Sequence, residues 1–338
     1  MGDIAYWLPL VWAAILAVAV TLYVILDGFG LGLGILFPFA PKEERRDVMM
    51  NTIAPFWDGN QTWLVLGGGG LFVAFPKAYA VIMSGLYLPI IVMLLALVFR
   101  GVAFEFRWVA KPNHRIWDLA FSYGAIVATF AQGVVLGGLL QGIKIVDGQF
   151  AGGALDWLTP FALLCGVGLL AGYALLGTTW LIYKTDGDLQ NWARYRANSA
   201  LLAVLAATVA ISLWTPFSVP GIFERWFSWP NLLLLSPVPL LTAAAAYFCW
   251  QGIEDDSSDT KAFVSAICLF LLGLAGLVIS NVPYLVPRTI TVWQAAAAPS
   301  SQMFMLIGTL LMLPIILGYT AFVYWTFRGK VRAGEGYH

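Results

Sequence analysis

The sequence predicts an all-α integral membrane protein with about nine transmembrane helices, and two observations predict it. Hydrophobic residues make up 60% of the 338 residues and charged residues only 11%, with a mean hydropathy of +0.82. A soluble domain carries about a quarter charged residues, so this composition cannot cover a surface that faces water. Apolar stretches also recur along the whole chain, and a helix needs about 20 such residues to cross a bilayer.

A window of that length places the transmembrane spans along the chain. The second span is short and follows the polar run 57–61, Trp-Asp-Gly-Asn-Gln. The spans are expected near 8–36, 60–75, 78–99, 117–143, 157–183, 198–216, 231–250, 262–284 and 303–327. Grouped in fours, they predict one four-helix bundle over 1–143, a second over 144–284, and a final helix with its tail over 285–338.

The lysines and arginines predict the orientation. Fourteen of the 18 basic residues fall in one set of alternate loops, and the loops rich in Lys and Arg stay on the cytoplasmic side. The other set holds only Lys77, Lys144, Arg225 and Arg288. We therefore expect a periplasmic N-terminus and a cytoplasmic C-terminus. No basic region precedes the first apolar run, so we expect a retained helix rather than a cleaved signal peptide.

Charged residues inside a span are informative because each costs about 2.5–3.5 kcal/mol on insertion scales. Asp27 is the one carboxylate well inside a predicted span. Asp58 lies at the cytoplasmic mouth of the second span, and Arg100 and Glu105 lie at the cytoplasmic end of the third. From residue 157 onward, no predicted span contains Asp, Glu, Lys or Arg. The front half therefore holds the candidates for proton chemistry, and the back half is expected to be a hydrophobic scaffold.

Each of these residues has a functional and a structural interpretation. Buried carboxylates can relay protons through ordered water, so Asp27 and Asp58 fit a proton path from the cytoplasm. Alternatively, Asp58 caps the second helix, and Asp27 pairs with Arg100 or with a partner subunit. Trp57 and Arg100 could hold the head group of a quinone or a lipid, although a basic residue at the interface is more often a lipid-phosphate anchor.

Glycines indicate where helices approach closely. Gly28 and Gly32 have the GxxxG spacing, which removes side-chain bulk from one helix face. Four consecutive glycines in the short second span indicate tight helix packing or a locally irregular helix. They are Gly67, Gly68, Gly69 and Gly70.

The histidines argue against a haem ligated by this chain. Membrane b-type haems take axial ligands such as His from within helices, whereas His114 falls in a loop and His338 is the last residue. The three cysteines lie apart in apolar stretches, without the spacing of a metal site. The formal net charge is zero and no basic patch is present, so nucleic acid is excluded as a partner.

Several segments resemble subunit II of cytochrome bd-type quinol oxidases. The resemblance begins at 26–34, Leu-Asp-Gly-Phe-Gly-Leu-Gly-Leu-Gly, and is most specific over 51–70, which runs from Asn-Thr-Ile-Ala-Pro-Phe-Trp-Asp to the four glycines. It continues through 74–76, 99–105 and 156–161. The number and orientation of the predicted helices also match along the whole chain.

This resemblance implies a subunit of a quinol:oxygen oxidoreductase in the bacterial inner membrane. The haem-bearing subunit I would carry the b and d haems and the quinol-oxidising loop. Subunit II would stabilise it and contribute a proton path, here through Asp27, Asp58 and Glu105. Small single-helix subunits can join the complex, and Trp57 and Arg100 match positions near a structural quinone in some members. Many relatives have a second aspartate at Gly30, and this departure points to the cyanide-insensitive branch.

Two other functions remain open at the level of the sequence. The chain could be a secondary transporter with an ion site near Asp27, because midplane ion sites are formed by broken helices. It could also be a membrane scaffold without redox or transport activity. A tight haem-bearing partner would distinguish the oxidase subunit from both.

Overall fold

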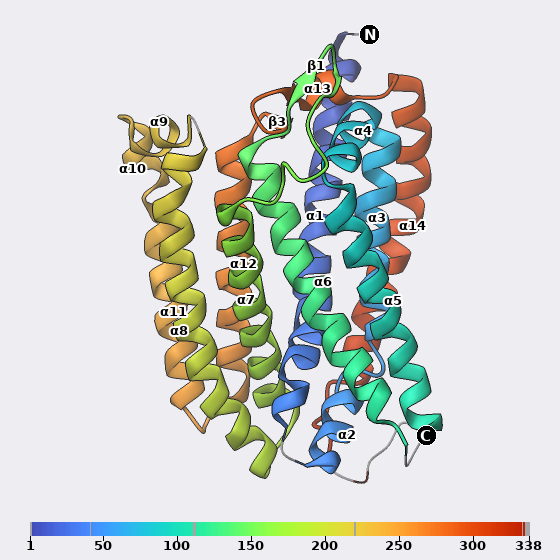
Figure 1. Cartoon of the computed structure of the whole chain (residues 1–338), viewed down its shortest axis with the longest axis vertical. Helices are drawn as coiled ribbons and strands as arrows, with labels where there is room; N and C mark the ends of the chain where they lie inside the picture. Colours follow the sequence, from blue (N-terminus) through green and yellow to red (C-terminus); the bar gives the residue numbers. More distant parts are fainter. Residues whose placement is uncertain (1, 41, 111–112, 220, 333, 335–338) are drawn as a thin grey trace.

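The computed structural model describes residues 2–40, 42–110, 113–219, 221–332 and 334, and forms an elongated helix bundle (Figure 1). His338, named above, and Lys111, one of the fourteen basic residues counted above, lie outside the described residues. The helices are α1 (Gly2–Leu36), the 3-10 turn η1 (Phe37–Phe39), α2 (Glu43–Asn51), α3 (Trp57–Ala74), α4 (Pro76–Gly85), α5 (Tyr87–Val109), α6 (Arg115–Gln141), α7 (Pro160–Lys184), α8 (Gly187–Ser218), α9 (Ile222–Phe227), α10 (Asn231–Leu235), α11 (Pro237–Glu254), α12 (Asp259–Asn281), α13 (Val292–Ala295) and α14 (Pro299–Thr326).

Eight candidate spans are long and apolar enough to cross a membrane within the described residues, and α3 with α4 forms a ninth if this bent pair counts once. The predicted number of about nine is therefore confirmed. The predicted third span, 78–99, was misplaced: it covers α4 and the first half of α5. The chain bends by 119° between α3 and α4, where Pro76 begins the new helix. The predicted spans 60–75 and 78–99 divide at this bend, but they miss the second break, at Leu86 between α4 and α5, because both sides of it are apolar.

Two short hairpins add a little β-structure to the all-α fold. Strand β1 (Ile145–Val146) pairs with β2 (Gln149–Phe150), and β3 (Tyr284–Val286) pairs with β4 (Ile290–Thr291). Both hairpins lie at the upper end of the molecule in Figure 1, opposite α2. The lower end, where α2 and the C-terminus lie, carries most Lys and Arg residues and is called the basic end below.

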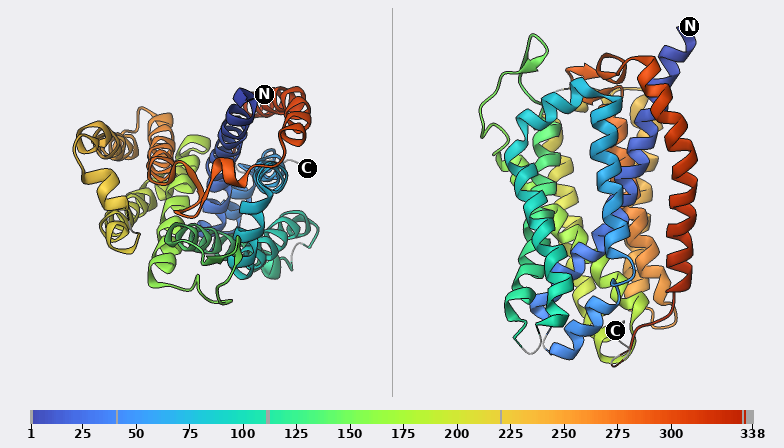
Figure 2. Two further views of the ribbon diagram at one scale, coloured as in Figure 1. Left: turned by 90° about the horizontal axis from the view of Figure 1, so that it is seen from above. Right: turned by 90° about the vertical axis from the view of Figure 1, so that its right-hand side faces the viewer.

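Helix α1 lies in the interior and contacts α3, α6, α7 and α14. Seen from above, α8 and α11 form one margin of the molecule, and α14 lies at the other side (Figure 2). The closest approach of α1 is to α7: a Cβ on Gly32 would lie 1.9 Å from the carbonyl oxygen of Tyr173, and one on Gly177 would lie 2.6 Å from the carbonyl carbon of Gly32. Gly28 faces the ring of Tyr173 on the same side of α1. These glycines allow the backbones of the two helices to touch.

The four-glycine run lies inside α3, which is helical from Trp57 to Ala74. A Cβ on Gly70 would lie 2.6 Å from the side chain of Leu16, and one on Gly67 would lie 3.5 Å from Val20. Gly68 and Gly69 have no atom of the described chain within 4 Å of such a Cβ. The run therefore presents one side to α1 and leaves the other side of α3 open.

Four basic side chains from the back half cap the carboxyl ends of helices. Arg194 donates to the carbonyl oxygens of Gly252 and Ile253 in the last turn of α11, at 3.2 and 2.7 Å. The other three are Lys184 on Phe327 and Gly329 after α14, Arg225 on Ile279 and Val282 at the end of α12, and Arg288 on Gln141 at the end of α6. Each satisfies carbonyls that lack a partner within their own helix.

The caps lie outside the predicted spans of the back half, whose role as a hydrophobic scaffold stays a prediction. The predicted windows after residue 157 hold no charged residue, but the helices are longer than the windows. Helix α7 ends on Lys184, which is 2% exposed, and α8 includes Arg194, which is 9% exposed. The back half therefore buries two cations at the basic end.

Candidate functional site

Asp27 and Arg100 form an ion pair inside the bundle. Arg100 on α5 donates through Nη1 to Oδ1 of Asp27 on α1 at 2.9 Å, and the two residues are 2% and 0% exposed. A buried charge is tolerated only when an opposite charge and hydrogen bonds offset its desolvation. Arg100 thus lies inside the bundle, bound to Asp27.

The pair leaves polar atoms without a partner among the described residues. These buried atoms are Oδ2 of Asp27 and Nε and Nη2 of Arg100. A Cβ on Gly30 would lie 2.7 Å from Nη2 of Arg100. The guanidinium therefore occupies the space that a side chain at position 30 would need. Buried polar groups of this kind are commonly satisfied by ordered water.

Asn60 joins α3 to α1 beside this ion pair. Its Nδ2 donates to the carbonyl oxygen of Leu26 at 2.8 Å, and its Oδ1 accepts from the Tyr324 hydroxyl of α14 at 3.0 Å. Leu26 directly precedes Asp27 in α1. The polar run that begins α3 is therefore connected, through one amide side chain, to the backbone of the residue that precedes Asp27.

Asp58 and Glu105 lie on the surface of the chain, at the same level of the bundle. Trp57 stacks on Phe104, with ring centroids 5.1 Å apart and an interplanar angle of 26°. Asp58 follows Trp57 and Glu105 follows Phe104, and both carboxylates are exposed without a hydrogen bond or ion pair to the described residues. Helix α3 begins at Trp57 and no side chain caps it. Asp58 lies in the first turn of α3, where a negative charge interacts favourably with the helix dipole.

A second polar cluster was missed by the sequence analysis. Tyr173 of α7 donates to Oε1 of Gln132 at 3.0 Å, and Nε2 of Gln132 donates to the Tyr23 hydroxyl at 2.7 Å. Tyr23 lies one turn before Asp27 on α1. A search for charged residues cannot find this cluster because none of its members carries a formal charge. The i, i+4 spacing of Tyr23 and Asp27 is the signal that could have indicated it.

Metal ligands do not converge within the described residues, since no group of three or more His, Cys, Asp or Glu is arranged to hold an ion. His114 lies at the basic end, with its Nε2 3.4 Å from Glu43 and 3.7 Å from Asp118. The arrangement of the front half thus offers a buried ion pair, connected polar side chains and two exposed carboxylates, which are groups that bind water and protons.

Comparison with solved structures supports the fold. The chain is similar to a chain of the bd oxidase from Geobacillus thermodenitrificans, with a TM-score of 0.80. The match covers 95% of this chain and 98% of the other, at 15% sequence identity. At that identity the likeness concerns the arrangement of the helices alone.

Curated relatives are similar over nearly their whole length. The chain is 29% identical to cytochrome bd-I ubiquinol oxidase subunit 2 of Escherichia coli K12, covering 96% of this chain and 95% of the relative. It is 30% identical to cytochrome bd ubiquinol oxidase subunit 2 of Bacillus subtilis, covering 96% and 97%. The family model described as cytochrome bd terminal oxidase subunit II matches residues 8–327. The chain therefore belongs to the cytochrome bd terminal oxidase subunit II family.

Proposed function

We propose that this chain is the haem-free subunit of a quinol:oxygen oxidoreductase in the bacterial inner membrane, bound to a haem-bearing subunit I. Two quinols and one O2 would give two quinones and two waters. The b and d haems and the quinol-oxidising site would belong to subunit I, and small single-helix subunits can complete the assembly. The role of this chain would be to support subunit I and to deliver protons from the cytoplasm. Family membership and the near-complete coverage of named oxidase subunits support this proposal.

The proton path would begin at Asp58 and Glu105. Both carboxylates are exposed and have no partner among the described residues, so their oxygens are free to exchange protons with water. The Trp57–Phe104 stack holds them at one level. The concentration of Lys and Arg at the basic end supports a cytoplasmic position for this end of the bundle, and thus proton uptake from the cytoplasm.

Asp27 would be the interior member of the path. Asn60 connects the beginning of α3 to the backbone beside Asp27, and Oδ2 of Asp27 has no protein partner. Water bound to Oδ2 would therefore be the point at which a proton passes. Arg100 would act as a positioning residue, because its hydrogen bond to Oδ1 fixes the orientation of the carboxylate.

A structural quinone near Trp57 and Arg100 is a further part of the proposal. The two free nitrogens of Arg100 could donate hydrogen bonds to quinone carbonyls, and Trp57 supplies an aromatic face. The ion pair speaks against the transporter alternative. A transported cation at Asp27 would lie beside the guanidinium of Arg100 and would be repelled by it.

Substitution of Asp58 tests the proton path. We expect Asp58→Asn to lower oxygen consumption of the purified complex by about a hundredfold, the lower end of the range for a lost proton-transfer group, while the haem spectrum and the yield of the complex stay unchanged. Asp256→Asn is the matched control, since Asp256 is 91% exposed on a loop of the back half. Normal turnover of Asp58→Asn in a fully assembled complex would refute the path.

A further inference from the structure

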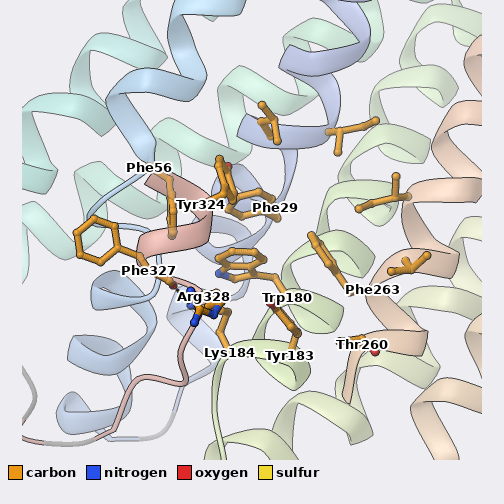
Figure 3. Close-up of a pocket in the computed structure, with 14 residues that line it drawn as sticks. Phe29, Phe56, Trp180, Tyr183, Lys184, Thr260, Phe263, Tyr324, Phe327 and Arg328 are labelled. Carbon is orange, nitrogen blue, oxygen red and sulfur yellow. Dashed lines mark hydrogen bonds between the residues drawn. The ribbon is translucent and has the colours of Figure 1, made fainter. Parts of the chain in front are cut away.

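A cavity of about 330 Å³ opens at the basic end, between α1, α7, α12 and α14 (Figure 3). It lies on a different side of α1 from Arg100, and neither Arg100 nor Trp57 lines it. Its size is at the lower end of the range typical of ligand pockets. The groups assigned to the proposed proton path do not account for it.

The walls of the cavity are aromatic and aliphatic. Phe29, Phe56, Trp180, Phe263 and Tyr324 surround it. The rings of Trp180 and Phe29 are stacked with their centroids 4.1 Å apart, and those of Tyr324 and Phe56 with their centroids 4.4 Å apart. These stacks fix the wall side chains, so the cavity is preformed. An apolar chain would gain about 25 cal/mol for each Å² removed from water.

Two cations stand at one end of this apolar cavity. Lys184 and Arg328 line it below Trp180, and no Asp or Glu is among the lining residues (Figure 3). The ammonium group of Lys184 donates to two carbonyl oxygens, which leaves one of its three N–H donors. Arg328 is exposed and uses Nη1 for the carbonyl oxygen of Trp325, so its other nitrogens remain available. The opening thus presents unneutralised positive charge with free donors.

The cavity also coincides with the loosely held last helix. Within the described residues of α14, Gln302 alone is buried, near the end opposite the cavity. At the basic end, Tyr324 of α14 contacts Phe56 and Asn60. Phe327, directly after α14, contacts Phe56 and accepts a hydrogen bond from Lys184. A ligand in the cavity would therefore fill the gap between α14 and α12.

We propose that this cavity binds an anionic phospholipid, with an acyl chain between the aromatic rings and the phosphate on Lys184 and Arg328. Basic pockets between transmembrane helices bind anionic head groups, and an apolar cavity with a cationic opening matches an amphiphile of opposite charge. A neutral ligand would leave the two cations uncompensated. The lipid would hold α14 against α1, α7 and α12.

The test uses native mass spectrometry of the complete, delipidated complex in detergent, titrated with palmitoyl-oleoyl-phosphatidylglycerol. Phosphatidylcholine with the same chains is the neutral comparison. We expect one phosphatidylglycerol to bind more tightly than phosphatidylcholine. Arg328→Gln should weaken that binding by about fivefold, since one cation near the membrane surface contributes about 1 kcal/mol.

Two further variants separate charge from volume. Ile267→Trp should fill the cavity, to which Ile267 contributes a wall, and should abolish the specific adduct. Arg115→Gln removes an exposed cation at the same end that does not line the cavity, and should leave binding unchanged. Equal affinity for the two lipids, or equal losses in Arg328→Gln and Arg115→Gln, would overturn the proposal. The proposal would also be overturned if the adduct that Ile267→Trp loses were a neutral isoprenoid quinone.

Discussion

The front and back halves of the bundle neutralise buried positive charge in different ways. In the front half, carboxylates do so: Arg100 binds Asp27, and the fully buried Arg107 binds Asp47 and Asp118 at 2.6 Å each. In the back half, Lys184 binds backbone carbonyl oxygens. Arg194 binds the carbonyl oxygens of Gly252 and Ile253 and also pairs with the carboxylate of Asp259 at 3.2 Å.

Position along the helices accounts for Arg100, inside α5, and for Lys184, at the end of α7. Arg107 departs from this rule, because it lies in the last turn of α5 and still binds two carboxylates. Carbonyl groups in the middle of a helix already accept hydrogen bonds from their own helix, so a cation there requires an acid. The last four carbonyls of a helix lack such partners, and a basic side chain can satisfy them. An interior acid–base pair therefore marks a position where charge was retained despite its desolvation cost. A basic side chain that caps a helix end is explained by its structural role alone.

Breaking the interior pair should have the largest effect. We expect Arg100→Met to destabilise the complex by about 3–5 kcal/mol, because it leaves the carboxylate of Asp27 buried without its partner. The double variant Asp27→Leu/Arg100→Met should recover much of that loss, since no charge remains. Thermal unfolding of the purified complex measures both. A double variant as unstable as Arg100→Met would show that the charge of Asp27 is not the cause.

Removing a cap should cost less. Arg194→Met should destabilise by about 1.5–3 kcal/mol, the range for hydrogen bonds from a charged donor. The carbonyls of Gly252 and Ile253 and the carboxylate of Asp259 all lose this donor. Asp256→Asn should have little effect, because the carboxylate of Asp256 is exposed and its oxygen lies as far as 3.4 Å from Nε of Arg194. Chemical unfolding of the same complex compares the two variants. If they proved equal, the carbonyl contacts would not be what stabilises this end.

The contact between the two halves can be tested at Gly32. Gly32→Ala should destabilise by about 1–3 kcal/mol through overpacking, because the new methyl group would overlap the backbone of α7 at Tyr173. Gly273→Ala is the matched control on α12, where a Cβ would meet no described atom within 4 Å. That control should raise stability by up to about 1 kcal/mol through helix propensity. A loss of stability in both variants would point to a general intolerance of alanine.

The smallest effect is expected for the link to α14. Tyr324→Phe should cost about 1 kcal/mol, because the side-chain oxygen of Asn60 loses its donor. Tyr319→Phe removes an exposed hydroxyl from the same helix and should change nothing measurable. Differential scanning fluorimetry of the complex can resolve the pair, and an unchanged midpoint for Tyr324→Phe would mean that water replaces the hydroxyl.

Local sequence patterns predicted much of the fold, but they predicted only part of the candidate site. Hydropathy predicted the number of spans but misplaced the third, because the break at Leu86 interrupts the helix without interrupting the apolar sequence. Charge in an apolar stretch identified Asp27 and Arg100. It could not identify Tyr23, Gln132 and Tyr173, whose importance arises from being hydrogen-bonded to one another across three helices.

The sequence by itself determined that the chain spans a membrane and where its charges are costly, because both properties are sums over neighbouring residues. Only the tertiary structure decided which groups meet. It brought Arg100 to Asp27, Gly177 to Gly32, and the tail after α14 to Lys184. These partners are distant in the chain and are selected by how helices pack and by the need to satisfy each buried polar group. No local pattern contains that information.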